Sequence, residues 1–243
     1  MTAADRYLAT LTEHLDALMP RIGPELDEVA HRIAASVGDG GVVHVFGSGH
    51  SQLVALESAE RAGGLAAVNA IADVAVSPTG GRRASAIETL EGYGQIVFDT
   101  EDVRAGEVLI VVSNSGINPV PIDVAAAAAA RGVFVVAVGS PGHSEASPAR
   151  DRRGRRLPDV ADVTLDTGTP VGDAAVRLDD GAGTGPLSTI LAMAVVHALI
   201  SRCAELLVEA GRTAPLLTSQ NLGDTDVNAG VYERYAPRTR RRP

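Results

Sequence analysis

Residues 108–138 place the strongest constraint on the fold. Two runs rich in β-branched residues, 108–112 and 133–138, flank a segment that ends in the alanine run 125–130. Fully buried strands of a parallel sheet are continuous apolar runs, and consecutive parallel strands are usually joined by a crossover helix. The segment therefore predicts a β-α-β unit within an α/β fold that has a parallel sheet.

The other apolar patterns extend this fold along the chain. Residues 5–37 have apolar side chains at helical spacing that is interrupted at Pro20 and Pro24, which predicts two amphipathic helices. The long last helix is expected to have Ser188 or Thr189 as its N-cap. The remaining patterns predict strands at 42–46, 66–71, 163–165 and 176–178, helices at 51–62, 87–97 and 188–210, and a polar, arginine-rich loop at 141–160.

Length and composition favour a single domain. A chain of 243 residues, of which 45% are hydrophobic, can bury a sizeable core. We expect one domain over residues 1–237, with a helical N-terminal extension at 1–38. The basic tail 238–243 is predicted to be disordered.

Residue usage excludes several classes of chemistry. The 21 basic residues are all arginine, so the chain has no lysine for a Walker A loop, a Schiff base or attachment of pyridoxal phosphate. Cys203 is the single cysteine, which excludes an internal disulfide and a zinc site of several cysteines. The net charge of −9 and the 3% of aromatic residues argue against a nucleic-acid partner.

The apolar segments give no sign of a membrane protein. The N-terminal residues lack the apolar core of a signal peptide, and no apolar run is both long enough and sufficiently free of glycine to span a bilayer. The lone cysteine also fits a reducing compartment. We therefore expect a soluble, cytoplasmic protein without a membrane partner.

Two loops carry the candidate ligand site. The first loop, residues 47–51 (GSGHS), follows the strand at 42–46, and the second loop, residues 113–118 (SNSGIN), follows the strand at 108–112. Glycine lets a backbone approach a ligand, and hydroxyl groups beside the free N–H groups of a helix start hold anions. Either loop alone also fits an ordinary tight connection. Together, at the carboxyl ends of parallel strands, they predict an anion site and favour phosphate at the second loop.

These loops and three other motifs resemble the sugar isomerase (SIS) domain family of phosphosugar isomerases and phosphosugar-binding regulators, in particular its stand-alone phosphosugar-binding branch. The resemblance implies an α/β three-layer sandwich with a five-stranded parallel sheet flanked by helices, with N-terminal helices and a long C-terminal helix. It also implies a phosphorylated sugar as ligand and a homo-oligomer, dimer or tetramer, with sites near subunit contacts. The matching motifs span most of the chain: VFGSGHS at 45–51, RAGG at 61–64, SNSGINPVP at 113–121, PVGDA at 170–174 and GPLST at 185–189.

The resemblance assigns phosphate contacts to the second loop. Ser113, Ser115 and Asn118 would hold the phosphate, and many members have threonine or serine at the position of Asn118. His143 and Asn228 are weaker candidates, with solvation or turn formation as the alternative. The remaining candidate contacts to the sugar or its phosphate are Gly47, Ser48, His50, Ser51, Arg61, Asn114, Asp173 and Asn221.

Removal of a proton from carbon 2 of a sugar phosphate requires a base. Glu57 and Glu60, on the helix expected after the first loop, are the carboxylate candidates, and Glu57 is favoured. An ion pair with Arg61, four residues on, is the alternative role of Glu57. His197 is the imidazole candidate, because heptose-phosphate isomerases resemble this segment and have a catalytic histidine on their last helix. A buried structural histidine is the alternative.

We expect neither a metal nor a cofactor. The heptose-phosphate isomerase branch can place a metal-binding His and Glu on the helix after the first loop, but Glu57 and Arg61 occupy these positions here, and arginine is not a metal ligand. A Rossmann dehydrogenase is excluded because Gln52 replaces its third glycine and no acidic residue lies near Asn69 at the end of the second strand.

The predicted function is an enzyme that acts on a sugar or amino-sugar 6-phosphate by abstraction of the carbon-2 proton. With a hydroxyl group at carbon 2 the product is that of an aldose-ketose isomerase. With an N-acetylamino group there, loss of the carbon-3 substituent gives a β-eliminating lyase or dehydratase. The alternative is a non-catalytic phosphosugar sensor that acts through a protein partner. Only about 40 residues precede the first strand, too few for a helix-turn-helix domain.

Overall fold

A five-stranded parallel sheet forms the centre of the computed structural model, which describes residues 1–221 and 225–239. Strands β1 and β3 are neighbours, and Gly47 at the end of β1 pairs with Val112 at the end of β3. The first and second loops therefore leave adjacent strands at the point where the order reverses, which is where open α/β sheets bind ligands. The order is β2-β1-β3-β4-β5, with β1 at Val43–Gly47, β2 at Val68–Ile71, β3 at Val108–Val112, β4 at Phe134–Gly139 and β5 at Val163–Asp166.

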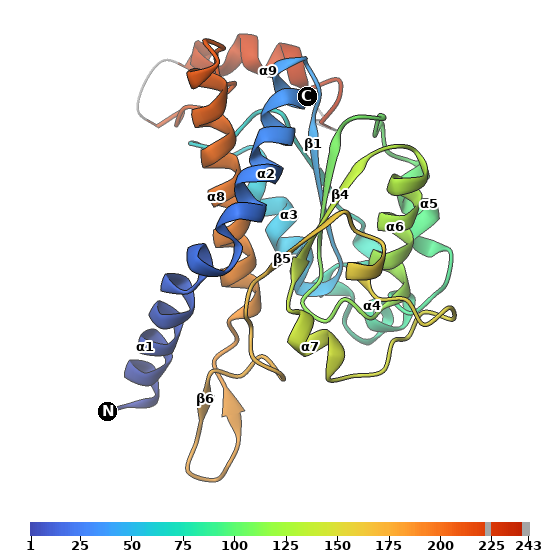
Figure 1. The fold of residues 1–243 in the computed structure, drawn as a ribbon, viewed down its shortest axis with the longest axis vertical. Coiled ribbons are helices and arrows are strands. Elements are labelled where there is room, and N and C mark those ends of the chain that lie inside the picture. Colours follow the sequence, from blue (N-terminus) through green and yellow to red (C-terminus); the bar gives the residue numbers. More distant parts are fainter. Residues whose placement is uncertain (222–224, 240–243) are drawn as a thin grey trace.

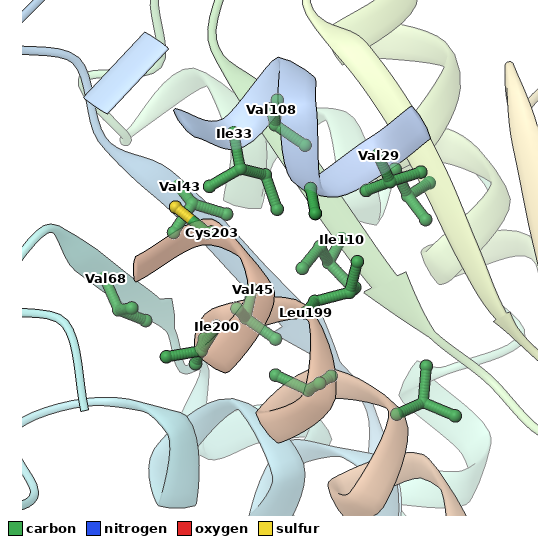
Figure 2. Close-up of a cluster of buried hydrophobic side chains, with 14 of the residues drawn as sticks. Val29, Ile33, Val43, Val45, Val68, Val108, Ile110, Leu199, Ile200 and Cys203 are labelled. Atoms are coloured by element: carbon green, nitrogen blue, oxygen red, sulfur yellow. The ribbon is translucent and has the colours of Figure 1, made fainter. Parts of the chain in front are cut away.

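Helices cover both faces of the sheet, which confirms the predicted three-layer α/β architecture (Figure 1). Helices α2 (Leu18–Gly38), α3 (Gln52–Ser58) and α8 (Ser188–Glu209) pack on one face, and α5 (Tyr93–Asp99) and α6 (Pro119–Ala130) pack on the other. Successive strand residues point to opposite faces. Figure 2 shows the first of these cores, in which side chains of α2 and α8 meet Val43, Val45, Val68, Val108 and Ile110.

The N-terminal helices break at a different position from the predicted one. Helix α1 (Ala3–Asp16) ends before both prolines, and α2 continues through Pro20 and Pro24. Pro20 lies in the first turn of α2, where a missing N–H costs nothing. The helix tolerates Pro24 because its apolar stripe is buried against the sheet and α8, through residues Ile22, Leu26, Val29, Ile33 and Val37.

Three other predicted elements are shorter than expected. The helix expected at 51–62 ends at Ser58. The helix expected at 87–97 begins only at Tyr93, as α5, because α4 (Gly81–Ile87) ends at the start of this range and Gly92, at φ 80°, precedes α5. The strand expected at 176–178 is β6 (Val176–Arg177), which pairs with β7 (Gly183–Thr184) in a separate hairpin. The described chain also contains α7 (Pro141–Glu145), inside the segment expected to be a loop, and α9 (Ala229–Tyr235).

Helix α8 is long and apolar enough to cross a membrane, by length and composition alone, so the expectation that no segment passes this test is wrong. Its buried side chains, including Leu199, Ile200 and Cys203, pack against α2 and the sheet (Figure 2). Core helices of soluble proteins have this composition, and the packing of α8 accounts for its hydropathy.

A buried polar cluster fixes the C-terminal segment to the sheet. Glu107, just before β3, lies 3.0 Å from the Nε2 atom of His44 and accepts hydrogen bonds from Arg238 and from the backbone N–H of Arg104. Burial alone would raise the pKa of Glu107, but these partners lower it to about 2. Arg238, assigned to a disordered tail in the sequence prediction, is thus held in the structure; residues 240–243 lie outside the described part of the chain.

Candidate functional site

The first loop, the second loop and the start of α8 meet around one cavity. It lies at the carboxyl ends of β3 and β4. The sheet topology brings the loops together, and the packing of α8 on the same face adds the third wall. The lining residues are Ser51, Val112, Asn114, Val138, Gly139, Thr167, Ser188, Thr189 and Ala192.

The first loop presents Ser51 to this cavity. Gly47 is required for the turn, because a Cβ atom there would lie 2.4 Å from the carbonyl oxygen of Ser51. Ser48 is buried and its hydroxyl group donates a hydrogen bond to Oε1 of Glu88 at 2.5 Å, whereas His50 is exposed. Of the candidates in this loop, Ser51 thus lines the cavity, while Gly47 and Ser48 shape the loop.

The second loop separates this cavity from another of similar size. Gly116 adopts a left-handed conformation at φ 60°, and its N–H donates to the Ser113 hydroxyl group at 3.1 Å. Ser115 is half-buried, and its hydroxyl group makes no hydrogen bond with the described residues. The polar lining of the other cavity consists of Ser113, Asn114, Ser115, Ser140, Ser144 and Thr164.

Free backbone N–H groups in the second loop form the donor set for an anion. Within residues 1–221 and 225–239, no hydrogen bond is made by the N–H groups of Asn114, Ser115, Ile117 and Asn118. Consecutive free N–H groups around a left-handed residue form an anion-binding nest. Together with the Ser115 hydroxyl group, they give this loop the chemistry of a phosphate site.

The first turn of α6 does not add the N–H donors that the sequence predicted. Pro119 and Pro121 have no N–H, and the N–H of Val120 donates to the carbonyl oxygen of Glu88 at 3.2 Å. A helix start normally leaves several free donors for an anion. Here the donors come from the loop that precedes the helix.

The packing of α3 against α8 brings two catalytic candidates together. Oε1 of Glu57 lies 3.7 Å from Nε2 of His197, and Glu57 also forms an ion pair with Arg61. Burial, and then the positive charge of Arg61, lower the pKa of His197 below its usual value of 6.5. His197 is therefore a neutral imidazole at pH 7. Both side chains are about one-third exposed (38% for Glu57 and 34% for His197), and neither lines the cavity described above.

Glu60 lies outside the helix that carries Glu57. Helix α3 ends at Ser58, so Glu60 is not on the helix where the sequence placed it, and its φ angle is 53°. Non-glycine residues rarely adopt such a left-handed conformation. Glu60 is exposed, and the turn that it forms leads the chain toward β2.

Asp173 caps α8 in place of the predicted Ser188 or Thr189. Its carboxylate accepts hydrogen bonds from the N–H groups of Leu187 and Ser188, both at 2.9 Å, and from the Ser188 hydroxyl group at 2.6 Å. Leu187 occupies the N-cap position and has no capping side chain. The carboxylate is favourable there because the N-terminus of a helix carries partial positive charge. Asp173 thus fixes the wall of the cavity.

The other candidates occupy varied positions. His143, on α7, lies 3.3 Å from the side-chain nitrogen of Asn114, next to the second loop. Asn228 is buried and exchanges two hydrogen bonds with the backbone of Thr218, which is the predicted turn role rather than a ligand contact. Asn221 is exposed, and its N–H donates to Ser219.

A group of three carboxylates, Glu91, Asp123 and Asp151, is the one set within the described residues that is close enough to share a metal ion. The guanidinium group of Arg155 donates to Asp151 at 2.8 Å and lies 3.9 Å from Asp123. Arg155 lowers the pKa of Asp151 to about 2, whereas burial raises the pKa of Asp123. Because a cationic side chain already pairs with two of the three carboxylates, and none of the three lines the cavity, we assign no metal to the group.

Sequence reasoning missed two residues that contact the loops. Glu88 accepts from Ser48 of the first loop, and Arg150 donates to Oδ1 of Asn118 in the second loop at 3.0 Å. Neither belongs to a motif, and each lies about 30 to 40 positions from its partner in the chain. No local signal could have identified these contacts.

Known proteins resemble this chain over most of its length. The sequence pattern of the SIS domain family matches residues 6–140. A UPF0309 protein from Geobacillus thermodenitrificans is 33% identical over 237 residues (96% of this chain, 95% of that protein), and one from Brucella canis is 37% identical over 237 residues (96% of each).

Two solved structures share the fold. One is a phosphoheptose isomerase from Neisseria gonorrhoeae, with a TM-score of 0.54 and 21% identity, covering 82% of this chain and 98% of that one. The other is a phosphoheptose isomerase from Francisella tularensis, with a TM-score of 0.53 and 18% identity, covering 84% of this chain and 100% of that one. At this level of identity these matches show the fold.

Proposed function

This chain belongs to the SIS domain family, and we propose that it binds a phosphorylated sugar at the second loop and transfers the carbon-2 proton with Glu57 and His197. The main supporting observation is the 3.7 Å approach of Glu57 to His197 from two helices that both begin at the cavity. The names of the two related structures, both phosphoheptose isomerases, support a sugar phosphate as ligand.

Helix geometry relates the two parts of the proposed site. Glu57 lies five residues into α3 from Gln52, which is about 7.5 Å along the axis, and His197 lies nine residues into α8 from Ser188, about 13.5 Å. A sugar anchored by its phosphate at the second loop would extend along the seam between these helices. The reacting carbon would then lie near the pair rather than near the phosphate.

The two side chains have different chemical roles in this proposal. The Glu57 carboxylate removes the carbon-2 proton, and neutral His197 moves a proton between the oxygens of carbons 1 and 2. With a hydroxyl group at carbon 2, the enediolate takes the proton back at carbon 1, as in an aldose-ketose isomerase. With an N-acetylamino group there, the enolate expels the carbon-3 substituent, which leaves as water or an alcohol with a proton, as in a dehydratase or lyase. Because the pair is partly exposed, we include in the proposal a second copy of the chain that covers it, in a cytoplasmic homo-oligomer.

Binding of the phosphate is tested by Ser115→Ala. Ser115 has a half-buried hydroxyl group that makes no hydrogen bond with the described protein residues, so its removal costs the ligand a charge-assisted hydrogen bond without disturbing the fold. We expect affinity to fall roughly 10- to 100-fold, measured by calorimetry with hexose, heptose and N-acetylhexosamine 6-phosphates. Ser85→Ala, on the exposed face of α4, is the matched control. Equal affinities for the sugars with and without phosphate would contradict the proposal.

We expect turnover to slow as the pH falls below 6.5. His197 is neutral above its lowered pKa and becomes protonated as the pH falls through it, so the acid limb of the rate profile should lie below 6.5. Arg61→Gln removes one of the two causes of the lowered pKa and should shift this limb to higher pH. The profile is measured as the rate of product formation between pH 4.5 and 8. A shift to lower pH in the variant would contradict this role of Arg61.

A non-catalytic phosphosugar sensor is the second candidate. The ion pair between Glu57 and Arg61 favours the sensor, because the guanidinium group of Arg61 binds the carboxylate that an enzyme would use as its base. Binding alone does not separate the two functions, since both need the second loop. Exchange of the carbon-2 proton separates the two functions, because the enzyme removes this proton and a sensor does not.

A further inference from the structure

The segment that follows β4 is hydrogen-bonded to the backbone of the second loop at three residues. The loop carbonyl oxygens of Asn114, Gly116 and Ile117 accept hydrogen bonds from the N–H groups of Ser140 (3.1 Å), Leu157 (2.8 Å) and Arg150 (3.0 Å), respectively. The sequence predicted residues 141–160 to be a polar, arginine-rich loop. In the structure, the segment places Arg150 beside the loop to which we assign the phosphate.

The second loop itself supplies no charge. Its hydroxyl and amide groups are neutral, and the two prolines at the start of α6 remove N–H donors that usually hold an anion there. A phosphate monoester carries about 1.5 to 2 negative charges at pH 7. Transferring such an anion from water to neutral donors alone is costly, so a cation near the loop would add substantially to affinity.

Arg150 is the arginine placed to supply this charge. One N–H of its guanidinium group, on Nη1, donates to Oδ1 of Asn118 at 3.0 Å, and Arg150 is exposed. Within the described residues no carboxylate lies within ion-pair distance of Arg150, whereas Arg155 is paired with Asp151 and Arg61 with Glu57. Arg156 is also engaged, since it donates to the carbonyl oxygen of Ser147 at 2.7 Å.

The contact with Asn118 explains how the guanidinium group is positioned. Asn118 occupies the N-cap position of α6, and its side chain makes no capping hydrogen bond, since Pro121 has no N–H and the N–H of Val120 donates to Glu88; Oδ1 accepts from Arg150 instead. A guanidinium group has five N–H donors in a planar fork that fits phosphate oxygens. With one donor used on Asn118, the others are available to a ligand.

From these contacts we infer that Arg150 is a phosphate-binding residue that makes the site selective for the dianionic form of the sugar phosphate. The inference rests on the proposed function, since it concerns the phosphate end of the same site. It adds a cationic group, which the second loop itself lacks.

Substitution of Arg150 by glutamine tests this inference. The exposed side chain can be changed without loss of fold, which a thermal melt verifies, and Arg152→Gln is the matched control because its side chain makes no hydrogen bond or ion pair with the described residues. The probes are glucose 6-phosphate and inorganic phosphate, titrated by calorimetry at pH 5.5 and pH 8. Since phosphate monoesters gain their second charge near pH 6, wild-type affinity should rise between these values.

We expect Arg150→Gln to weaken binding at pH 8 at least 10-fold and to remove most of the difference between the two pH values. Arg150→Lys should recover part of the loss, and Arg152→Gln should match the wild type. If the wild type binds glucose 6-phosphate and the affinity of Arg150→Gln is within 2-fold of the wild-type affinity, the role of Arg150 is overturned and the proposed function stays intact. A wild-type protein that binds no sugar phosphate would overturn both.

Discussion

The Glu57→Gln variant is expected to lose carbon-2 proton exchange by about 10²- to 10⁴-fold, the range that a positioned general base contributes. Glutamine keeps the size of the side chain and its position 3.7 Å from His197, but it cannot take up the proton. His197→Gln should lower the rate of product formation comparably. Because the two residues act on one substrate, the double variant should be little slower than the slower single variant.

The same variants should bind the substrate normally. Glu57 and His197 do not line the cavity between the two loops, so phosphosugar affinity should stay within about 3-fold of the wild type, as expected for changes that do not touch the anchoring contacts. Glu60→Gln is the control, since this carboxylate lies beyond the end of α3. If Glu57→Gln kept most of the exchange rate, or if Glu60→Gln lost it, the assignment of the base would be wrong.

Glu107→Ala is expected to lower the free energy of unfolding by about 3 to 5 kcal/mol, the cost of breaking a buried ion pair. The side chain is 5% exposed, and its removal leaves the N–H groups of Val42 and Arg104 without their acceptor and takes one of its two carboxylate partners from Arg238, which keeps Asp102. Urea unfolding at pH 7 measures the loss. Glu28→Ala, which removes an exposed ion pair with Arg32, should cost about 0 to 1 kcal/mol. Equal losses in the two variants would contradict the structural role of Glu107.

The pH dependence of stability provides a second measure of the same cluster. The pKa of Glu107 is about 2 in the folded state and 4.5 as its ordinary value, so the folded state binds the proton more weakly than the unfolded chain. The resulting stabilisation, about 3 kcal/mol, is fully present above pH 4.5 and is lost as the pH falls towards 2. Glu107→Gln should therefore reduce the dependence of stability on pH in this range.

The sheet could be predicted because its signals are local. The runs 108–112 and 133–138 are too apolar for any position but a buried strand, and the alanine segment between them fits only a crossover helix. The positions of the two loops follow from the same pattern, since each begins where an apolar run ends. The same local reasoning placed Glu57 on a helix that starts at the site.

The side-chain partners of the site could not be predicted in this way. Asp173 caps a helix that begins 15 residues later, and Arg150 reaches Asn118 across 32 positions of the chain. Such contacts depend on how separate elements pack, which leaves no periodicity or spacing in the sequence. The approach of Glu57 to His197 has the same origin, because each was a candidate alone and only the packing of α3 on α8 joins them.

The decisive measurement is exchange of the carbon-2 proton in deuterated water. Wild-type protein is incubated with hexose, heptose and N-acetylhexosamine 6-phosphates, and the carbon-2 signal is followed by NMR. We predict deuterium at carbon 2 of at least one bound sugar phosphate, accompanied by an isomerised or eliminated product. Saturating binding without exchange in any of these sugars would contradict the enzyme and leave a phosphosugar sensor as the function of this chain.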